Sequence, residues 1–230
     1  MPVLPYFPIP IYVHDTYEDP DEYNSIQKEL NGVCEKIKWE KLENRPDSSH
    51  LLSPSAFNNN VLKQYNCKKF INFLHKHVML YIGTFDNPMF NITKEYIIDS
   101  AWLTNTKKGQ HALQHTHGPT DISGVYYIET NGKDGNLFFQ DPHSDKVGNL
   151  IMDLCCGTTS SEMPLKQGVI MMWPGFMGHG TRDNTTDSTR ISLSFNLMFS
   201  RRGFTIKDNV IDSERAYVKR EKGWKDKKCY

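Results

Sequence analysis

The strand-like segments in the second half of the chain constrain its fold most strongly. From Glu95 to Phe199, short runs of β-branched and aromatic residues are separated by Gly, Asn, Asp and Pro, which is typical of strands and turns. The run Asn131–Gly135 has the composition of a hairpin connection. Because no helices alternate with these segments, the pattern predicts an antiparallel jelly roll. We expect its strands at Tyr96–Asn105, Ala112–His117, Ser123–Glu129, Asn136–Gln140, Asn149–Leu154, Gly168–Trp173, Met177–Thr181 and Arg190–Phe199.

The first half of the chain has helical periodicity instead. Apolar residues recur at helical spacing in Asp19–Lys38, which begins with an Asp-Pro start signal, and again in Asn59–Ile82. Four prolines in the first ten residues exclude a helix there, although Ile11–Val13 can form a short edge strand. The polar segment 39–58 is long enough to be a functional lid, and the loop 141–148 is the other candidate. The fold class is therefore mostly β (α+β), with the N-terminal helices packed on one face of the jelly roll.

Length and composition limit the organisation and the partners of the chain. Its 230 residues, 38% of them hydrophobic, can bury one full core. We expect a single domain, 1–230, with an N-terminal helical annex (1–94), a jelly-roll core (95–200) and a C-terminal tail (201–230). The formal net charge of zero gives no reason to expect a nucleic-acid or membrane partner, and no apolar run approaches the length of a membrane span. Five cysteines without a Cys-x-x-Cys pattern indicate a reducing compartment, so we expect a cytoplasmic protein.

Three histidines of the second half form a candidate metal site. His115 and His117 stand in a His-x-His pair, and a strand places side chains i and i+2 on the same face. If this run is extended, both imidazoles point to one side of a sheet. His179 lies far downstream, after the apolar run Val169–Trp173, and a jelly roll brings early and late strands side by side. The three side chains can then occupy one face of a metal ion and leave the opposite face open, as in the facial triad that holds Fe(II).

The pair His75 and His77 has the same spacing in a different context. These residues lie in the second predicted helix, where residues i and i+2 point about 200° apart. The two side chains cannot share a metal ion, and we interpret them as ordinary helix residues.

The last predicted strand adds a second polar group to this candidate site. Polar and apolar residues alternate from Arg190 to Leu197 at the period of a half-buried strand. One face of this strand therefore presents four polar side chains together, those of Arg190, Ser192, Ser194 and Asn196.

The order of these motifs resembles a known family. After the His-x-His pair come Ser-Gly-Val-Tyr-Tyr-Ile (123–128), Phe-Gln-Asp-Pro (139–142), Gly-Val-Ile-Met-Met-Trp-Pro (168–174), His179 and Arg-Ile-Ser-Leu-Ser-Phe-Asn (190–196). This ordered set is similar to the 2-oxoglutarate/Fe(II) oxygenases related to prolyl hydroxylases, specifically a small group from marine bacteria and their phages. The resemblance spans nearly the whole chain. It implies a double-stranded β-helix and the cofactors Fe(II) and 2-oxoglutarate.

The resemblance also implies roles for individual residues. His115, His117 and His179 correspond to the iron ligands. Arg190 corresponds to the residue that pairs with the distal carboxylate of 2-oxoglutarate. Arginine suits this task because its planar fork binds a carboxylate through two hydrogen bonds. Ser192 would add a hydroxyl bond to the same carboxylate, as would Tyr127.

Some of these assignments have competitors in the sequence. The wider superfamily has Asp or Glu where this chain has His117, and Asp121 is the substitute carboxylate. However, Gly118 and Pro119 break the strand between His117 and Asp121. Arg182 competes with Arg190, but it stands in a polar loop and is expected to be solvated. Tyr126, next to Tyr127, should point away from the site.

The expected activity is that of a dioxygenase, in which O2 and 2-oxoglutarate are consumed as an unidentified substrate is hydroxylated. Peptidyl proline is suggested only by analogy. Two other functions stay open. A three-histidine, cupin-like metal enzyme would not need 2-oxoglutarate, and a non-catalytic jelly-roll protein of a virion or a binding module would use the histidines structurally. If the protein is viral, we expect it in the cytoplasm of the host.

Overall fold

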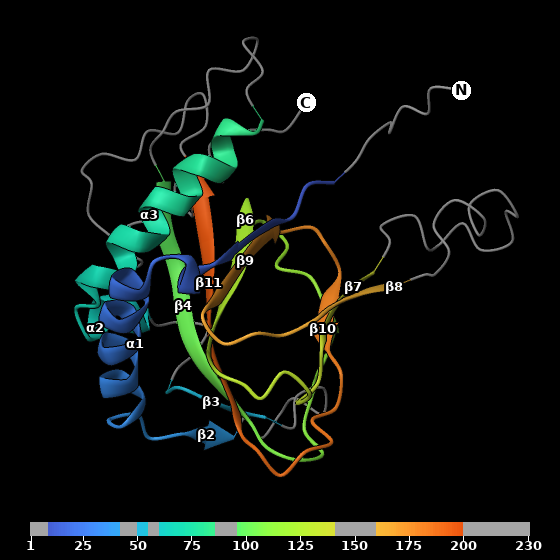
Figure 1. Ribbon diagram of the computed structural model, residues 1–230. Coiled ribbons are helices and arrows are strands. Elements are labelled where there is room, and N and C mark those ends of the chain that lie inside the picture. The colour runs from blue at the N-terminus through green and yellow to red at the C-terminus, as the bar shows by residue number, and fades with distance from the viewer. Residues whose placement is uncertain (1–8, 42–49, 55–59, 86–95, 141–159, 200–230) are drawn as a thin grey trace, which may run out of the picture.

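The computed structural model describes residues 9–41, 50–54, 60–85, 96–140 and 160–199. Its strands form two antiparallel sheets, and the helices lie outside one of them (Figure 1). The larger sheet has the strand order β1-β9-β6-β11-β4-β3-β2, and the smaller one has the order β5-β10-β7-β8. The strands are β1 (Tyr12–Asp15), β2 (Glu40–Lys41), β3 (Leu51–Leu52), β4 (Tyr96–Thr106), β5 (Ala112–His115), β6 (Ile122–Glu129), β7 (Leu137–Gln140), β8 (Ser160–Met163), β9 (Val169–Pro174), β10 (His179–Thr181) and β11 (Arg190–Phe199).

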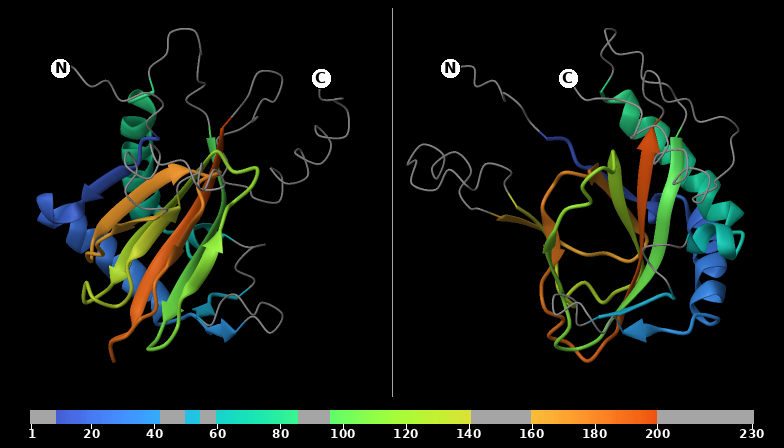
Figure 2. Two further views of the ribbon diagram at one scale, coloured as in Figure 1. Left: turned by 90° about the vertical axis from the view of Figure 1, so that its right-hand side faces the viewer. Right: turned by 180° about the vertical axis from the view of Figure 1, so that it is seen from behind.

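The connections from β4 to β11 are those of a jelly roll. Strands β4, β6, β9 and β11 belong to the larger sheet, whereas β5, β7, β8 and β10 belong to the smaller one. The chain therefore crosses repeatedly between the two sheets, which enclose a space between them (Figure 2). The predicted mostly β fold, a double-stranded β-helix with helices on one face, is confirmed.

Side-chain alternation in the larger sheet creates two separate cores. Leu193 and Phe195 of β11 face the helices and pack there with Phe70 and Tyr126. The alternate residues of the neighbouring strands β6 and β9, such as Val125, face the smaller sheet. The second core joins the two sheets and consists of Val125, Tyr127, Leu137, Phe139, Leu165, Val169, Met171, Trp173 and Met177.

The helices α1 (Pro20–Cys34), α2 (Val61–Gln64) and α3 (Lys68–Gly83) cover the outer face of the larger sheet (Figure 1). Helix α1 begins where the sequence predicts, because the Asp19 side chain accepts a hydrogen bond from the amide of Glu22. Helix α3 has no capping side chain of its own. Instead, Glu29 of α1 accepts hydrogen bonds from the amides of Lys69 and Phe70, so one helix caps the start of the other.

The predicted second helix, Asn59–Ile82, is wrong as a continuous element. The chain forms α2, turns at Asn66 and starts again as α3. Asn66 has a φ of 53°, in the left-handed region that asparagine tolerates better than most residues. The apolar stripe continues across the break because Leu62 and Phe70 enter the same core. Periodicity alone therefore did not reveal the break between α2 and α3.

The predicted hairpin at Asn131–Gly135 is also wrong. Strand β6 precedes this segment and belongs to the larger sheet, whereas β7 follows it and belongs to the smaller one. The segment is a crossover between the sheets, closed by the buried Asp134 carboxylate, which accepts hydrogen bonds from the Thr130 hydroxyl and the Asn131 amide.

The other strand predictions differ from the structure mainly at their ends. The edge strand expected at Ile11–Val13 is β1, at the edge of the larger sheet. Strand β8 was not predicted. The predicted strand 149–154, the loop 141–148, most of the proposed lid 39–58 and the tail 201–230 lie outside the described residues. In the described part of the chain, no helix is long and apolar enough to cross a membrane.

The helix–sheet core predicts a large effect for a substitution at Phe70, which is fully buried. Phe70→Ala should lower the free energy of unfolding by about 3–5 kcal/mol, because it leaves a cavity between α3 and the sheet. Leu80→Ala on the same helix is the control, since Leu80 is 55% exposed and should cost at most about 0.5 kcal/mol. Urea unfolding followed by circular dichroism measures both values, and equal losses would contradict the assigned core.

His77 of α3 predicts a pH dependence of stability. Its side chain is buried, bonds the Tyr12 hydroxyl and stacks on His14. Burial, and then the charges of His14 and Lys76, lower the pKa of His77 from 6.5 to about 4. Between these pH values the unfolded chain binds more protons than the folded chain. The free energy of unfolding should therefore fall as the pH drops from 6.5 to about 4 and should lose no more through this group below that.

The test compares the unmodified protein with His77→Leu in urea unfolding at a series of pH values. Over this window the free energy of unfolding of the unmodified protein should fall by on the order of 3 kcal/mol more than that of His77→Leu. Parallel pH profiles for the two proteins would show that His77 is not the group responsible.

Candidate metal centre and cofactor pocket

Strand pairing brings His115 and His179 together. In the antiparallel pairing of β5 with β10, these two residues are direct partners. They are separated by more than sixty positions in the sequence, so only the jelly-roll topology makes them neighbours. Their ring centroids lie 4.5 Å apart.

His117 reaches the same place from outside the strand. Strand β5 ends at His115, so the prediction that one strand presents both imidazoles is wrong. The position of His117 is fixed by main-chain hydrogen bonds: its amide donates to the carbonyl of Gly175, and the amide of Gly175 donates to the carbonyl of Asp121. The two loops approach so closely that a Cβ atom on Gly175 would lie 2.2 Å from the carbonyl oxygen of Thr120.

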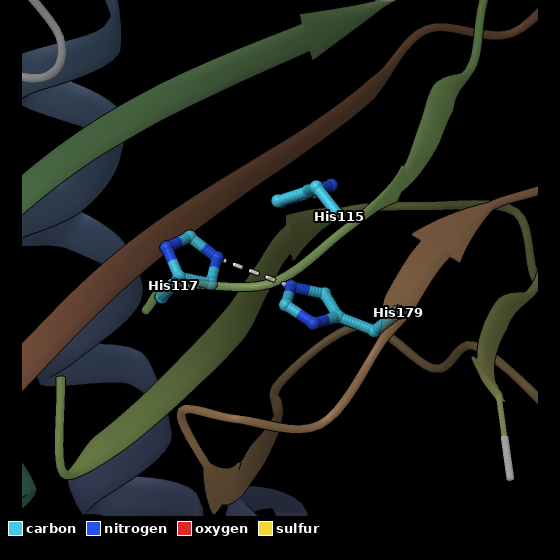
Figure 3. Close-up of side chains that lie close together, drawn as sticks. All are labelled: His115, His117 and His179. Carbon is cyan, nitrogen blue, oxygen red and sulfur yellow. Dashed lines mark hydrogen bonds between the residues drawn. The ribbon is translucent and has the colours of Figure 1, made fainter. Parts of the chain in front are cut away.

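The three rings form a compact cluster (Figure 3). Each ring offers one nitrogen, and these nitrogens all lie within 4.8 Å of one another. The Nε2 atoms of His117 and His179 are 3.2 Å apart. Two nitrogens bound at about 2.1 Å and at right angles around one ion would be about 3 Å apart. His117 and His179 therefore already have the spacing of two ligands of one metal ion.

Burial favours the neutral form of two of the rings, those of His117 and His179. Burial, with a smaller contribution from His115, lowers the pKa of His117 to about 4. Burial, with the charges of His115 and His117, lowers the pKa of His179 to about 3. A neutral imidazole has the lone pair that a metal needs, so both rings are available as ligands at neutral pH.

Asp121 takes another role in the structure. Its carboxylate accepts a hydrogen bond from the amide of Phe199, at the end of β11. Among the described residues, the metal-ligating cluster contains the three histidines and not Asp121.

A cavity of about 150 Å³ extends from the histidines into the space between the sheets. Arg190, Ser192 and Tyr127 all line it, together with His115, His117 and His179. Three of the four polar side chains predicted for one face of the last strand, Arg190, Ser192 and Ser194, therefore line this cavity. The structure brings all six predicted site residues to one pocket.

Arg190 is buried at the inner end of this pocket and has more partners than the sequence suggested. Its guanidinium donates to the carbonyls of Asp134 and Gly135 and, at 3.0 Å, to the Thr181 hydroxyl. Burial lowers its pKa, while Tyr127 and Asp134 oppose this effect. Arginine nevertheless stays charged in proteins. The guanidinium is therefore a fixed, buried positive charge.

Tyr127 and Tyr126 point in opposite directions, as predicted. Tyr127 lines the cavity, and burial raises the pKa of its hydroxyl while Arg190 opposes the increase. Tyr126 packs edge-on against Phe70 in the helix–sheet core.

The competing residues lie elsewhere, also as predicted. Arg182 forms an ion pair with Glu162, both partly exposed, and lies over the ring of Phe138. His75 stacks on Tyr96, whereas His77 is buried against Tyr12. Neither helix histidine belongs to the metal-ligating cluster of the described residues.

His50 was not predicted as a site residue. It is buried just before β3, lines the cavity, and its Nδ1 atom lies 2.9 Å from the carbonyl of His111. Burial lowers its pKa, so it enters the pocket as a neutral ring. A histidine in a polar segment carries no periodic signal, and only the pairing of β3 with β4 places it here.

Comparison with known proteins places this fold and site in a class. Residues 100–196 match the model of a family described as "Putative 2OG-Fe(II) oxygenase", where 2OG is 2-oxoglutarate. This segment includes the three histidines of the cluster and Arg190. No curated protein matches the sequence.

Several solved structures share the fold. HygX from Streptomyces hygroscopicus, with nickel, 2-oxoglutarate and hygromycin B bound, is 14% identical over 82% of each chain, with a TM-score of 0.51. A prolyl-4-hydroxylase from Pseudomonas putida is 11% identical over 84% of this chain and 94% of its own, with a TM-score of 0.53. An oxidoreductase of the 2OG-Fe(II) oxygenase family from Burkholderia pseudomallei is 11% identical over 81% of this chain and 83% of its own, with a TM-score of 0.57.

The chain shares its fold with 2-oxoglutarate/Fe(II) oxygenases, and the segment that matches the family model, residues 100–196, contains the histidine cluster. The family match and the shared fold agree with the resemblance inferred from the sequence and with the predicted cofactors, Fe(II) and 2-oxoglutarate. The narrower group from marine bacteria and their phages stays a prediction.

The cluster predicts which single substitutions remove the metal. We expect His115→Ala, His117→Ala and His179→Ala each to lose Fe(II), or Ni(II) as its surrogate, because two imidazoles alone hold these ions weakly. Asp121→Ala should keep full occupancy, since its carboxylate bonds the amide of Phe199 instead. Metal analysis of the purified variants after dialysis is the measurement. Loss in Asp121→Ala together with full occupancy in His117→Ala would assign the second ligand to Asp121.

Proposed function

We propose that this chain is an Fe(II)- and 2-oxoglutarate-dependent dioxygenase that hydroxylates an organic substrate. His115, His117 and His179 would hold the iron, and Arg190, Ser192 and Tyr127 would hold 2-oxoglutarate. The observation that carries this proposal is one cavity that contains both a cluster of three imidazoles and a buried arginine. The first can bind a divalent metal and the second can bind a carboxylate.

The chemistry of the proposed reaction belongs mainly to the bound cofactors. Iron with 2-oxoglutarate activates O2, and decarboxylation to succinate accompanies hydroxylation of the substrate. The chain supplies orientation and shielding. The three rings would hold the metal, while Trp102 and Trp173 pack beside His117 and His179 and would shield it from water.

Arg190 would bind the distal carboxylate of 2-oxoglutarate. Its carbonyl and hydroxyl partners orient the guanidinium but carry no full negative charge. A carboxylate in the cavity therefore adds a charge-assisted hydrogen bond in a setting of low dielectric constant. Ser192 is two residues along the same face, and its hydroxyl and that of Tyr127 would bond the same group.

As the substrate we propose a peptidyl prolyl residue. Support comes from the prolyl-4-hydroxylase of Pseudomonas putida and from a prolyl hydroxylase of Trichoplax adhaerens in complex with a peptide fragment of hypoxia inducible factor. HygX, which shares the fold, has hygromycin B bound instead, so the fold is also compatible with small-molecule substrates. Proline-containing peptides are the first substrates to test.

One observation favours a second candidate function. The metal-ligating cluster of the described residues contains three histidines and no carboxylate. Cupin-like metal enzymes that do not use 2-oxoglutarate can have such a site. Consumption of 2-oxoglutarate distinguishes the two functions.

We further propose that residues 1–230 form one domain that works in a reducing cytoplasm. Cys34 and Cys67, both at least partly buried, are free thiols, which supports the compartment.

Arg190 provides the decisive substitution. Arg190→Met should keep the metal and weaken 2-oxoglutarate binding by about 2–5 kcal/mol, the range for removing one partner of a buried charge pair. Arg190→Lys should cost less, because it keeps the charge and loses the planar fork. Arg182→Met is the matched control, since Arg182 lies outside the cavity in an exposed ion pair. Calorimetry of the anaerobic, Ni(II)-loaded proteins gives the affinities.

Release of succinate in air is the second measurement. If the unmodified, Fe(II)-loaded protein neither binds 2-oxoglutarate at millimolar concentration nor releases succinate, the dioxygenase proposal is wrong. Metal binding without either result would leave the cupin-like function.

A further inference from the structure

We propose that the orientation of the Asn196 side-chain amide is coupled to the tautomer of His117 and thereby to whether the histidine cluster can hold a metal. Asn196 would be a positioning residue that acts through His117. The inference rests on the proposed metal site and adds a partner to it. It follows from the different hydrogen-bond partners of the three Nδ1 atoms.

Two of the three rings have fixed tautomers. The Nδ1 atom of His115 lies 2.7 Å from the carbonyl of Leu113, and that of His179 lies 2.8 Å from the carbonyl of Met177. A carbonyl can only accept a hydrogen bond, so both Nδ1 atoms carry the proton. In the neutral form of each ring the Nε2 atom then has a free lone pair, as metal binding requires.

His117 is different because it lies beyond the end of β5. Its Nδ1 atom is 3.3 Å from Nδ2 of Asn196, a buried residue of β11, so in this structure the donating end of the amide faces the ring. An amide has a donating end and an accepting end. Which nitrogen of His117 carries the proton therefore depends on which end of the Asn196 amide faces the ring.

The other partners of Asn196 permit both orientations. The hydroxyl of Ser123 lies 2.9 Å from Oδ1, and the hydroxyl of Ser100 lies 3.1 Å from Nδ2. A hydroxyl can donate or accept. The amide can therefore rotate by half a turn while both serine hydrogen bonds reverse direction and survive.

The two orientations have opposite consequences at the cluster. With Nδ2 toward His117, Nδ1 accepts the hydrogen bond and the proton is on Nε2, where it can donate to Nε2 of His179, 3.2 Å away. With Oδ1 toward His117, the proton is on Nδ1 and the Nε2 lone pair is free. Exchange with water moves the proton between the two nitrogens, so the charge of the ring does not change. Only the second orientation offers three Nε2 lone pairs to one ion.

The test measures Zn(II) affinity by chelator competition in the unmodified protein, Asn196→Leu and Asn196→Asp. Asn196→Leu should bind Zn(II) about 10- to 100-fold more weakly, the usual effect of losing the partner of a ligating histidine. Asn196→Asp should bind at least as tightly as the unmodified protein, because a carboxylate can only accept from Nδ1. Asn105→Leu is the matched control: it removes a buried asparagine of β4 that does not line the cavity, and it should leave the affinity unchanged.

Nitrogen NMR of the imidazoles in the Zn(II)-loaded, unmodified protein reads the tautomer directly. His117 should show a protonated Nδ1 and a metal-bound Nε2. Coordination through Nδ1, or an affinity of Asn196→Leu equal to that of the unmodified protein, would overturn the inference. If Asn196→Leu does not fold, the NMR result and the Zn(II) affinity of Asn196→Asp still test the inference. Failure of the unmodified protein to bind Zn(II) would instead count against the proposed metal site as a whole.

Discussion

The site depends on the position of β11 between β4 and β6 in the larger sheet. Hydrogen bonds on both sides fix its register, so its two faces cannot exchange. One face packs Leu193 and Phe195 against the helices, and the other presents Arg190 to the cavity and Asn196 to His117. A shift by one residue would bury the arginine among apolar side chains. The register that buries the helix–sheet core is therefore also the register that places Arg190 in the candidate cofactor pocket.

The sequence predicted the parts of this arrangement that depend on local periodicity. The alternation in 190–199 gave the strand and the residues that share its inner face. The spacing from Asp19 onward gave α1 and its cap. The pairing of His115 with His179 could be anticipated only as a property of a jelly roll, because it is set by the register of two strands far apart in sequence.

Each wrong prediction used a local sequence rule for a feature that the rule does not determine. Turn composition at Asn131–Gly135 says that the chain turns but not which sheet the next strand joins. The i, i+2 rule for His115 and His117 needs an extended strand, and β5 ends too early. The carbonyl partners of Arg190 come from that same crossover, so no feature of its own strand could reveal them.

The contact at Gly175 joins the loops that deliver two of the proposed ligands. Main-chain hydrogen bonds attach the loop of His117 to the turn before His179, and no side chain fits at position 175. Neither loop can open without breaking these bonds, so His117 and His179 belong to one cooperative unit of local unfolding. His115 is joined to the same unit, because it is the direct strand partner of His179 in the pairing of β5 with β10. Thermal opening at this end of the barrel would therefore separate the three imidazoles together and not one at a time.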